Sequence, residues 1–182
     1  MRRLIPRLGL LVIMSVATVQ TTRAEAAKPT TPAEDSKSAT NAVPDVYALS
    51  GQFDRVVLLR FKSQSDLLDG LERMVKEQKI RNGVILSALG SVRSWHYHTI
   101  SKPGSPTQDV YVKNPEVPAD ILSMNGLVVD GRVHAHFTMA DLDKAFGGHL
   151  VTGTTVHTFA VVTIGVFKDG IDLNRIDDRT YR

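Results

Sequence analysis

The sequence predicts one compact α/β domain, of the α+β kind, in which β-strands predominate. Three observations support this fold class. The 182 residues suit a single domain with a sizeable core and appendages. Several runs are rich in β-branched and aromatic residues, and the longest of them covers residues 154–167. Residues 65–78 instead repeat apolar side chains at helical spacing, which indicates an amphipathic helix.

The first elements of the domain follow from local signals. A strand is expected at residues 55–61, where a run of valine and leucine is flanked by charged side chains. Residues 63–66 resemble a capping box, and the helical stripe after them begins at Leu67. The pair Asn82-Gly83 is expected to end the helical segment. We therefore expect a strand followed by one helix with a single buried face.

Five runs beyond the helix are expected to be strands, at residues 83–92, 94–100, 109–113, 121–129 and 154–167. The pair Asp130-Gly131 is a strong hairpin signal, because both residues tolerate positive φ. The hairpin leads directly into a further strand that carries His134. The long final run should be a central strand, since it is apolar on both faces.

Three histidines after the hairpin form the most informative pattern of the chain. His134 and His136 are separated by one residue, so on a strand their rings share a face, with Cα atoms about 6.6 Å apart. Gly147-Gly148 permits tight or positive-φ backbone geometry, which would bring His149 toward them and leave the two glycines bordering the pocket. Three neutral imidazoles suit zinc, with a fourth position for water or substrate. Two solvated histidines and an ordinary glycine turn are equally compatible with this spacing.

A second His-x-His lies upstream. His96 and His98 share one face of the 94–100 strand, and Trp95 and Tyr97 share the other. If the histidine face lined the same cavity, the pocket would contain five imidazoles, enough for metal ligands and a proton-transfer group. The alternative is a packed aromatic face with two solvated histidines. His157, a lone histidine on a strand, is interpreted as a structural residue.

Residues 1–26 have the pattern of a secretory signal peptide. Arg2, Arg3 and Arg7 precede an apolar segment, and Ala24-Glu25-Ala26 offers a cleavage site. The apolar segment covers residues 8–19, and a bilayer span needs about 20 apolar residues. We therefore expect an exported protein, secreted or periplasmic, that keeps no stable membrane span after cleavage.

With this interpretation of the amino terminus, the chain divides into three segments. After the leader at residues 1–26, residues 27–43 are rich in Pro, Thr, Ser and Ala and lack aromatics, so they are expected to be a flexible linker. Residues 44–182 then form the domain, with a core at about 54–168.

Composition argues against two classes of function. The absence of cysteine excludes a disulfide framework and cysteine-based metal or nucleophile chemistry. Removal of residues 1–26 changes the charged side chains from 22 basic and 19 acidic to 18 of each. A neutral chain without a basic cluster lacks the driving force for nucleic-acid binding.

The motifs around the histidines resemble a known family. Residues 131–150, together with the upstream stretches 83–92 (Gly-Val-Ile-Leu-Ser-Ala-Leu-Gly-Ser-Val) and 121–126 (Ile-Leu-Ser-Met-Asn-Gly), are similar in content and order to the plants-and-prokaryotes conserved (PPC) domain. The resemblance covers about residues 54–168. It departs from the family at Val133, where a proline is usual.

This resemblance carries several implications. It implies a compact domain with a largely antiparallel sheet flanked by helices, assembled as a homotrimer. Structural relatives of the family include acetolactate decarboxylase, in which a His-x-His and a later histidine hold zinc. By that resemblance His134, His136 and His149 are the expected ligands of a divalent metal, and zinc is the expected cofactor.

Three functions remain open at this stage. The first is a metal-dependent binder of a small molecule, with lyase or decarboxylase-like activity as its catalytic form. The second is a non-catalytic trimeric binding or scaffold module. The third, DNA binding, is least favoured because the mature chain is neutral and the leader directs it out of the cytoplasm. The sequence does not decide whether the protein is an enzyme, and fold resemblance alone does not transfer activity.

Overall fold

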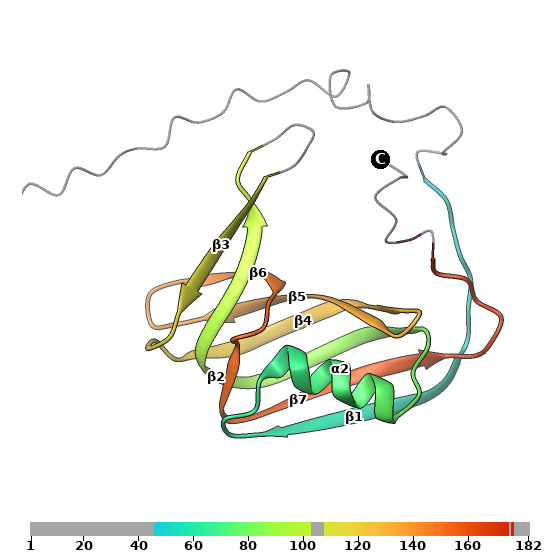
Figure 1. Cartoon of the computed structure of the whole chain (residues 1–182), viewed down its shortest axis with the longest axis horizontal. Coiled ribbons are helices and arrows are strands. Elements are labelled where there is room, and N and C mark those ends of the chain that lie inside the picture. The colour runs from blue at the N-terminus through green and yellow to red at the C-terminus, as the bar shows by residue number, and fades with distance from the viewer. Residues whose placement is uncertain (1–45, 103–107, 175, 177–182) are drawn as a thin grey trace, which may run out of the picture.

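A computed structural model describes residues 46–102, 108–174 and 176, which form one seven-stranded antiparallel sheet and one helix (Figure 1). The elements are β1 (Phe53–Lys62), α2 (Leu67–Glu77), β2 (Gly83–Ile100), β3 (Asp109–Asn114), β4 (Ala119–Val129), β5 (Arg132–Ala140), β6 (Ala145–Leu150) and β7 (Thr155–Phe167). The predicted leader and linker lie outside the described residues. Among the residues described, none of the helical structure is long and apolar enough to cross a membrane.

The antiparallel sheet is confirmed, whereas within the described residues the expectation of flanking helices is met by α2 alone. The strand order is β1-β7-β2-β4-β5-β6, with β3 paired to β2 outside this path. Strand β6 also pairs with β2, so β2, β4, β5 and β6 close into a ring. Strand β7 lies between β1 and β2, as expected for a central strand. The closing contact of the ring is what brings distant histidines together.

Strand β2 is a single strand of 18 residues, where the sequence indicated two. Its pairing with β7 shifts register at three places between Ile85 and Ser94, and each shift lets the strand bend without ending. Gly90, near the end of the strand predicted at residues 83–92, has a φ of 134° inside β2. A side chain there would meet the backbone of Phe159 on β7, so this glycine permits a close strand contact.

Helix α2 begins two residues later than predicted, and its cap differs from the predicted capping box. The Asp66 side chain accepts a hydrogen bond from the backbone N–H of Asp69 at 3.0 Å and another from Gly153 at 2.7 Å. The cap therefore fixes the helix start and ties it to the loop before β7. The buried face of the helix includes Leu67 and Leu71, in agreement with the apolar stripe.

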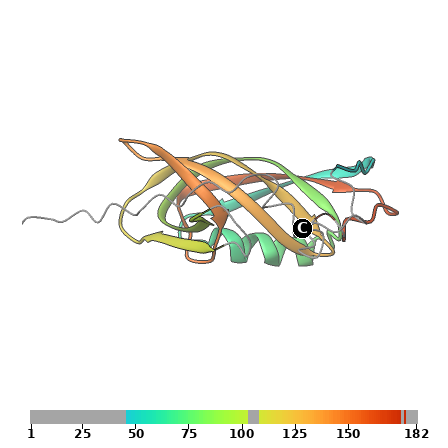
Figure 2. The same cartoon turned by 90° about the horizontal axis from the view of Figure 1, so that it is seen from above.

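The sheet has two different faces. Helix α2 lies along one of them, and the core lies between the helix and the strands (Figure 2). The opposite face carries large apolar side chains that remain at least 39% exposed. We call this surface the outer apolar face; it comprises Val56, Leu58, Leu86, Leu89, Leu122 and Phe159. A surface of this kind normally marks an interaction site.

Candidate metal centre

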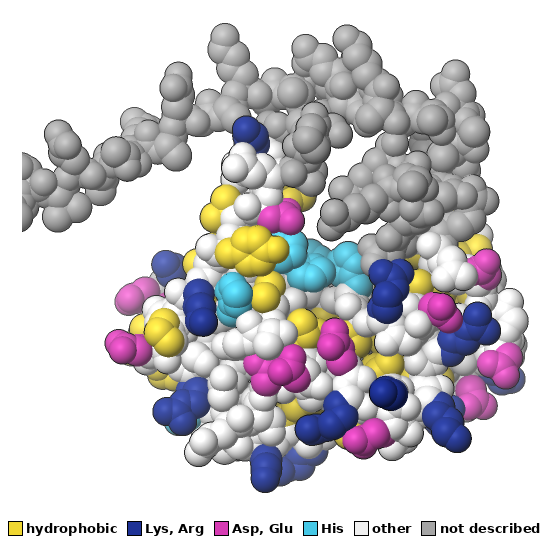
Figure 3. Space-filling model, in the orientation of Figure 1, with side chains coloured by type: hydrophobic (Ala, Val, Ile, Leu, Met, Phe, Trp, Pro, Cys, Tyr) yellow, Lys and Arg dark blue, Asp and Glu magenta, His cyan; other side chains and the backbone are white. Residues whose placement is uncertain are grey.

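The strand register places histidines from three strands side by side. His136 of β5 pairs directly with His149 of β6, and His149 pairs in turn with His98 at the closing contact between β6 and β2. His134 precedes His136 on the same face of β5. Figure 3 shows these imidazole side chains gathered at the base of the β2–β3 hairpin.

The group formed by His134, His136 and His149, which we call the three-histidine group, has the geometry of a metal site. One ring nitrogen from each residue lies within 4.8 Å of the others. The Nε2 atoms of His134 and His136 are 3.2 Å apart. The ring of His149 stands edge-on to both partners, with centroids 4.8 Å from His134 and 5.0 Å from His136. The three rings thus converge, as the sequence predicted.

The glycine pair brings His149 into the group by a different means from the backbone geometry expected from the sequence. Gly147 and Gly148 lie within strand β6 and form no turn. A Cβ on Gly147 would collide with the carbonyl oxygen of Phe137 on β5, and one on Gly148 would lie 2.5 Å from the carbonyl oxygen of His98 on β2. The missing side chains therefore let β6 fit between its two neighbours. Steric room, and not positive φ, brings His149 into the group.

The electrostatics around His136 favour its neutral imidazole. Burial, followed by the nearby rings of His134 and His98, lowers the pKa of His136 below its ordinary value of 6.5. A neutral imidazole keeps the lone pair that a metal ion requires. Protonation and metal binding compete for the same nitrogen, so the lowered pKa supports binding near neutral pH.

His98 joins this group, although the sequence left its place open. Its ring stacks on that of His149, with centroids 4.3 Å apart. Its Nδ1 atom is buried, has no hydrogen-bond partner among the described residues, and lies 3.7 Å from the Asp109 carboxylate. The ring of Tyr111 lies 5.2 Å away on its other side. Sequence reasoning missed Asp109 and Tyr111, because β3 pairs only with the far half of β2.

The other two histidines lie outside this cluster. The Nδ1 atom of His96 lies 2.8 Å from the carbonyl oxygen of Thr152, and its ring is 5.9 Å from Tyr111. His96 thus ties β2 to the loop before β7, outside the three-histidine group. His157 is exposed on β7. The five imidazoles expected to share one site are therefore reduced to a cluster of four, with His98 as the additional member.

In the acidic turn between β5 and β6, the Asp141 side chain bonds to the backbone of the same turn. One Asp141 carboxylate oxygen accepts hydrogen bonds from the backbone N–H groups of Asp143 and Lys144, both at 2.9 Å. These bonds lower the pKa of Asp141. The carboxylate is thus engaged in an Asx turn.

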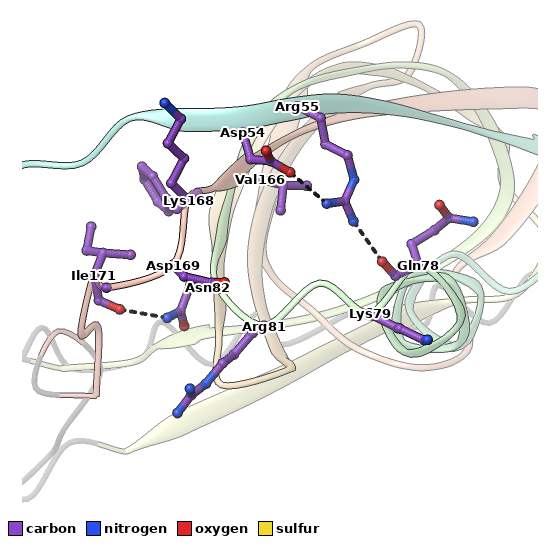
Figure 4. A pocket seen from close by; sticks show the side chains of 12 residues that line it. Asp54, Arg55, Gln78, Lys79, Arg81, Asn82, Val166, Lys168, Asp169 and Ile171 are labelled. Carbon is purple, nitrogen blue, oxygen red and sulfur yellow. Dashed lines mark hydrogen bonds and ion pairs between the residues drawn. The ribbon is translucent and has the colours of Figure 1, made fainter.

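A separate pocket of about 760 Å³ lies at the other end of the molecule and contains no histidine (Figure 4). The Arg55 guanidinium crosses it, bonding to Asp54 at 3.1 Å and to the carbonyl oxygen of Gln78 at 2.8 Å. Asn82 donates a bond to the carbonyl oxygen of Ile171. These contacts secure the end of α2 and the carboxyl-terminal segment, so we assign the pocket a structural role.

The fold and the three-histidine group define a small antiparallel-sheet domain with a candidate metal centre at the closing contact of the sheet. The family model of the Plants and Prokaryotes Conserved (PCC) domain matches residues 48–168. The chain belongs to this family, which confirms the resemblance seen in its motifs.

Solved structures share the fold. A plant- and prokaryote-conserved protein from Pyrococcus horikoshii matches with a TM-score of 0.59 and 21% identity, covering 75% of this chain and 94% of that one. A metal-containing protein from Archaeoglobus fulgidus matches with a TM-score of 0.57 and 24% identity, over 66% and 86%. Acetolactate decarboxylase from Bacillus subtilis matches at a TM-score of 0.43 and 12% identity, over 65% and 54%, which is too low to support an argument about function.

Curated relatives match over part of their length only. The bifunctional protein GlmU of Synechococcus sp. (strain JA-3-3Ab) is 31% identical over 111 residues, which is 60% of this chain. The match covers 17% of that relative, so the chain spans about a sixth of its length. The domain therefore also occurs as a segment of larger proteins.

Proposed function

We propose that this chain is an exported protein that binds a divalent metal ion, zinc, through His134, His136 and His149 and presents the ion to a small-molecule ligand. The observation that carries the proposal is the convergence of three imidazole nitrogens from two paired strands. Its support from outside the chain is the metal-containing protein that shares the fold.

The residues present fit a zinc ion. Zinc–nitrogen bonds of about 2.0–2.1 Å in a tetrahedral site separate two ligand nitrogens by about 3.3 Å. The Nε2 atoms of His134 and His136 are 3.2 Å apart. The His149 nitrogen lies within 4.8 Å of both, so a small movement of this half-buried ring would complete the set. A neutral donor set with no thiolate also accepts other divalent ions.

A bound ion would polarise a carbonyl or carboxylate oxygen of the ligand, or lower the pKa of a bound water. The chain itself supplies three neutral nitrogens and leaves the remaining positions of the ion open. Decarboxylase-like lyase activity is the catalytic form of this proposal.

Elemental analysis of the purified mature protein tests the metal centre. The wild type, dialysed without chelator, is expected to contain about one zinc per chain, and the His134→Ala/His136→Ala double variant none. His157→Ala is the matched control, because it removes an exposed imidazole outside the group, and it should retain the metal. A wild type that stays metal-free after zinc is added back would refute the proposal.

A second observation favours the scaffold function as a companion or alternative. The outer apolar face exposes Leu58 by 69% and Leu89 by 55% on neighbouring parts of the sheet. We propose that two further copies of the chain cover this face in a homotrimer, as the family resemblance predicts, because burial of such side chains stabilises association.

Light scattering of the eluting protein tests the trimer. The wild type should have the mass of three chains, and Leu58→Lys/Leu89→Lys should be monomeric. Leu142→Lys is the control, because Leu142 is fully exposed in the β5–β6 turn, outside this face. A monomeric wild type, or a trimeric double variant, would contradict the assembly. A metal-free trimer would leave the scaffold as the better account.

Export and nucleic-acid binding are tested separately. We propose that residues 1–26 direct export and are removed, so the amino-terminal sequence of the protein recovered outside the cytoplasm should begin near residue 27. The mature chain should show no salt-dependent affinity for duplex DNA, because its basic and acidic side chains balance. A full-length amino terminus would contradict the first statement, and strong binding at low salt the second.

A further inference from the structure

His98 is the one histidine of the cluster that the three-histidine group leaves without a role. Its side chain is 21% exposed, and its ring lies between the rings of His149, at 4.3 Å, and Tyr111, at 5.2 Å. The backbone pairing with His149 on one side and with Tyr111 on the other fixes the same arrangement. The ring is therefore held beside the metal centre and has little freedom to turn away.

The surroundings of Nδ1 fix which ring nitrogen carries the hydrogen. Nδ1 is buried without a hydrogen-bond partner among the described residues, and the Oδ1 atom of the Asp109 carboxylate lies 3.7 Å away. A carboxylate oxygen can only accept, so a lone pair on Nδ1 would be both buried and repelled. An N–H at this position is attracted to the carboxylate. Neutral His98 therefore carries its hydrogen on Nδ1 and its lone pair on Nε2.

A lone pair on Nε2 needs a hydrogen-bond donor, and the ring that carries it stacks on His149, one of the three proposed metal ligands. Among groups that bind a divalent ion through oxygen, a hydroxyl or a water can donate, whereas an ether, a carbonyl or a carboxylate cannot. We propose that His98, oriented by Asp109, accepts a hydrogen bond from the hydroxyl of a metal-bound ligand and so selects hydroxyl-bearing chelators over ligands that lack the hydroxyl. This inference rests on the proposed metal centre and names the ligand class of the same site.

In this arrangement the two side chains have different roles. His98 is a ligand-binding residue, because its Nε2 would touch the bound molecule. Asp109 is a positioning residue, because it acts through the hydrogen on Nδ1, in the way that outer carboxylates orient histidines in metal sites. Loss of Asp109 should therefore weaken the preference for a hydroxyl, and loss of His98 should abolish it.

The test uses the cobalt-substituted protein and two probes that differ by one hydrogen-bond donor. Glycolate and methoxyacetate both offer a carboxylate and a second oxygen, and only glycolate has an O–H. Each is titrated against the visible absorption of the bound cobalt. The wild type should bind glycolate about 3- to 10-fold more tightly than methoxyacetate, the ratio expected for one hydrogen bond.

Three variants separate the contributions. His98→Phe keeps a flat ring against His149 and removes the acceptor, so the ratio should fall to about 1. Asp109→Ala should give an intermediate ratio, and its nitrogen NMR spectrum should show that the fixed Nδ1–H form of His98 is lost. Asp143→Ala, which removes an exposed turn carboxylate, should match the wild type.

The outcomes separate the role of His98 from the proposed metal centre on which it depends. Cobalt uptake with equal affinity for the two probes, or an unchanged ratio in His98→Phe, would overturn the role of His98 and leave the metal centre intact. A wild type that shows no cobalt band would overturn the metal centre, and the role of His98 with it.

Discussion

The two halves of β2 each bury apolar side chains on one side of the strand, and their other sides have different uses. The first half, residues 83–92, lies between β7 and β4 and buries Ile85 and Val92 in the core. The second half, residues 94–100, lies between β3 and β6 and buries Trp95 and Tyr97. The buried side chains are apolar in both halves. The outward face changes from exposed leucines to histidines.

The difference between the halves depends on their neighbours. In the first half, the strands on both sides present apolar side chains outward, and together they make the outer apolar face. In the second half, β6 brings His149 against His98, and β3 brings Asp109. One strand thus joins a surface suited to association with a site suited to chemistry. Variants matched between the two halves test whether the halves can be separated.

The largest effect is expected from Gly148→Ala. The added Cβ would lie 2.5 Å from the His98 carbonyl oxygen and 2.8 Å from the Tyr97 ring, so β6 must move away from the second half of β2. We expect a loss of about 2–4 kcal/mol in the free energy of unfolding, together with loss of zinc uptake. Urea denaturation and elemental analysis measure the two effects.

The matched variant in the first half is Gly83→Ala. Its Cβ would lie 3.0 Å from the Gly165 carbonyl oxygen and 3.2 Å from Ile164, a tighter contact than usual but a smaller collision. We expect a cost of about 1 kcal/mol with zinc uptake retained. Equal loss of zinc in both variants would show that the two halves of β2 are not independent.

A smaller loss of stability than that of Gly148→Ala is expected from Thr154→Val. Thr154 is fully buried, and its hydroxyl bonds to the backbone of His96, accepting from the N–H at 3.1 Å and lying 3.0 Å from the carbonyl oxygen. Valine keeps the shape and leaves the buried N–H unpaired, which costs about 1–3 kcal/mol. Thermal unfolding measures the loss. Thr158→Val, which removes an exposed bond to Ser91 in the first half, should change stability by less than about 0.5 kcal/mol.

A smaller change in stability than in these variants is expected when the metal-free protein is acidified. The pKa of His136 is lowered in the folded state and has its ordinary value of 6.5 in the unfolded state. Below about pH 6.5 the unfolded chain therefore binds more protons than the folded chain. The free energy of unfolding should decrease as the pH is lowered through this range, and it should be constant above it. Urea denaturation from pH 5 to 8 checks this. His136→Ala should reduce the slope, and an unchanged slope would contradict the assignment.

The sequence predicted the parts of the molecule that depend on local pattern. The helix at 65–78 and the strand at 154–167 agree with α2 and β7 within two residues, because side-chain periodicity reports burial directly. The Asp130-Gly131 hairpin is confirmed, with both residues at positive φ. The grouping of His134, His136 and His149 was also predicted, although its steric cause was not.

The remaining features depend on contacts between distant strands. Nothing local to His98 indicates that β6 closes the ring against it or that Asp109 lies beside its Nδ1. The register shifts that keep β2 continuous past Gly90 respond to β7, some seventy residues later in the chain. Sequence periodicity describes one strand at a time, so it misses a site assembled from four.

The smallest effect is expected at Asp141, in the turn that joins the two strands of the three-histidine group. Asp141→Ala removes the acceptor of two backbone hydrogen bonds, so it should lower the melting temperature slightly, whereas Asp141→Asn keeps an acceptor and should not at pH 7. Because the backbone bonds lower the pKa of Asp141, its contribution is present above pH 3.8 and is lost as pH falls through the lower, folded-state value. Asp141→Asn should therefore lose less stability than the wild type between pH 5 and 3. Zinc affinity should be the same in all three proteins, since the turn only closes the hairpin; a weaker affinity in Asp141→Ala would instead show that this carboxylate helps to place His149.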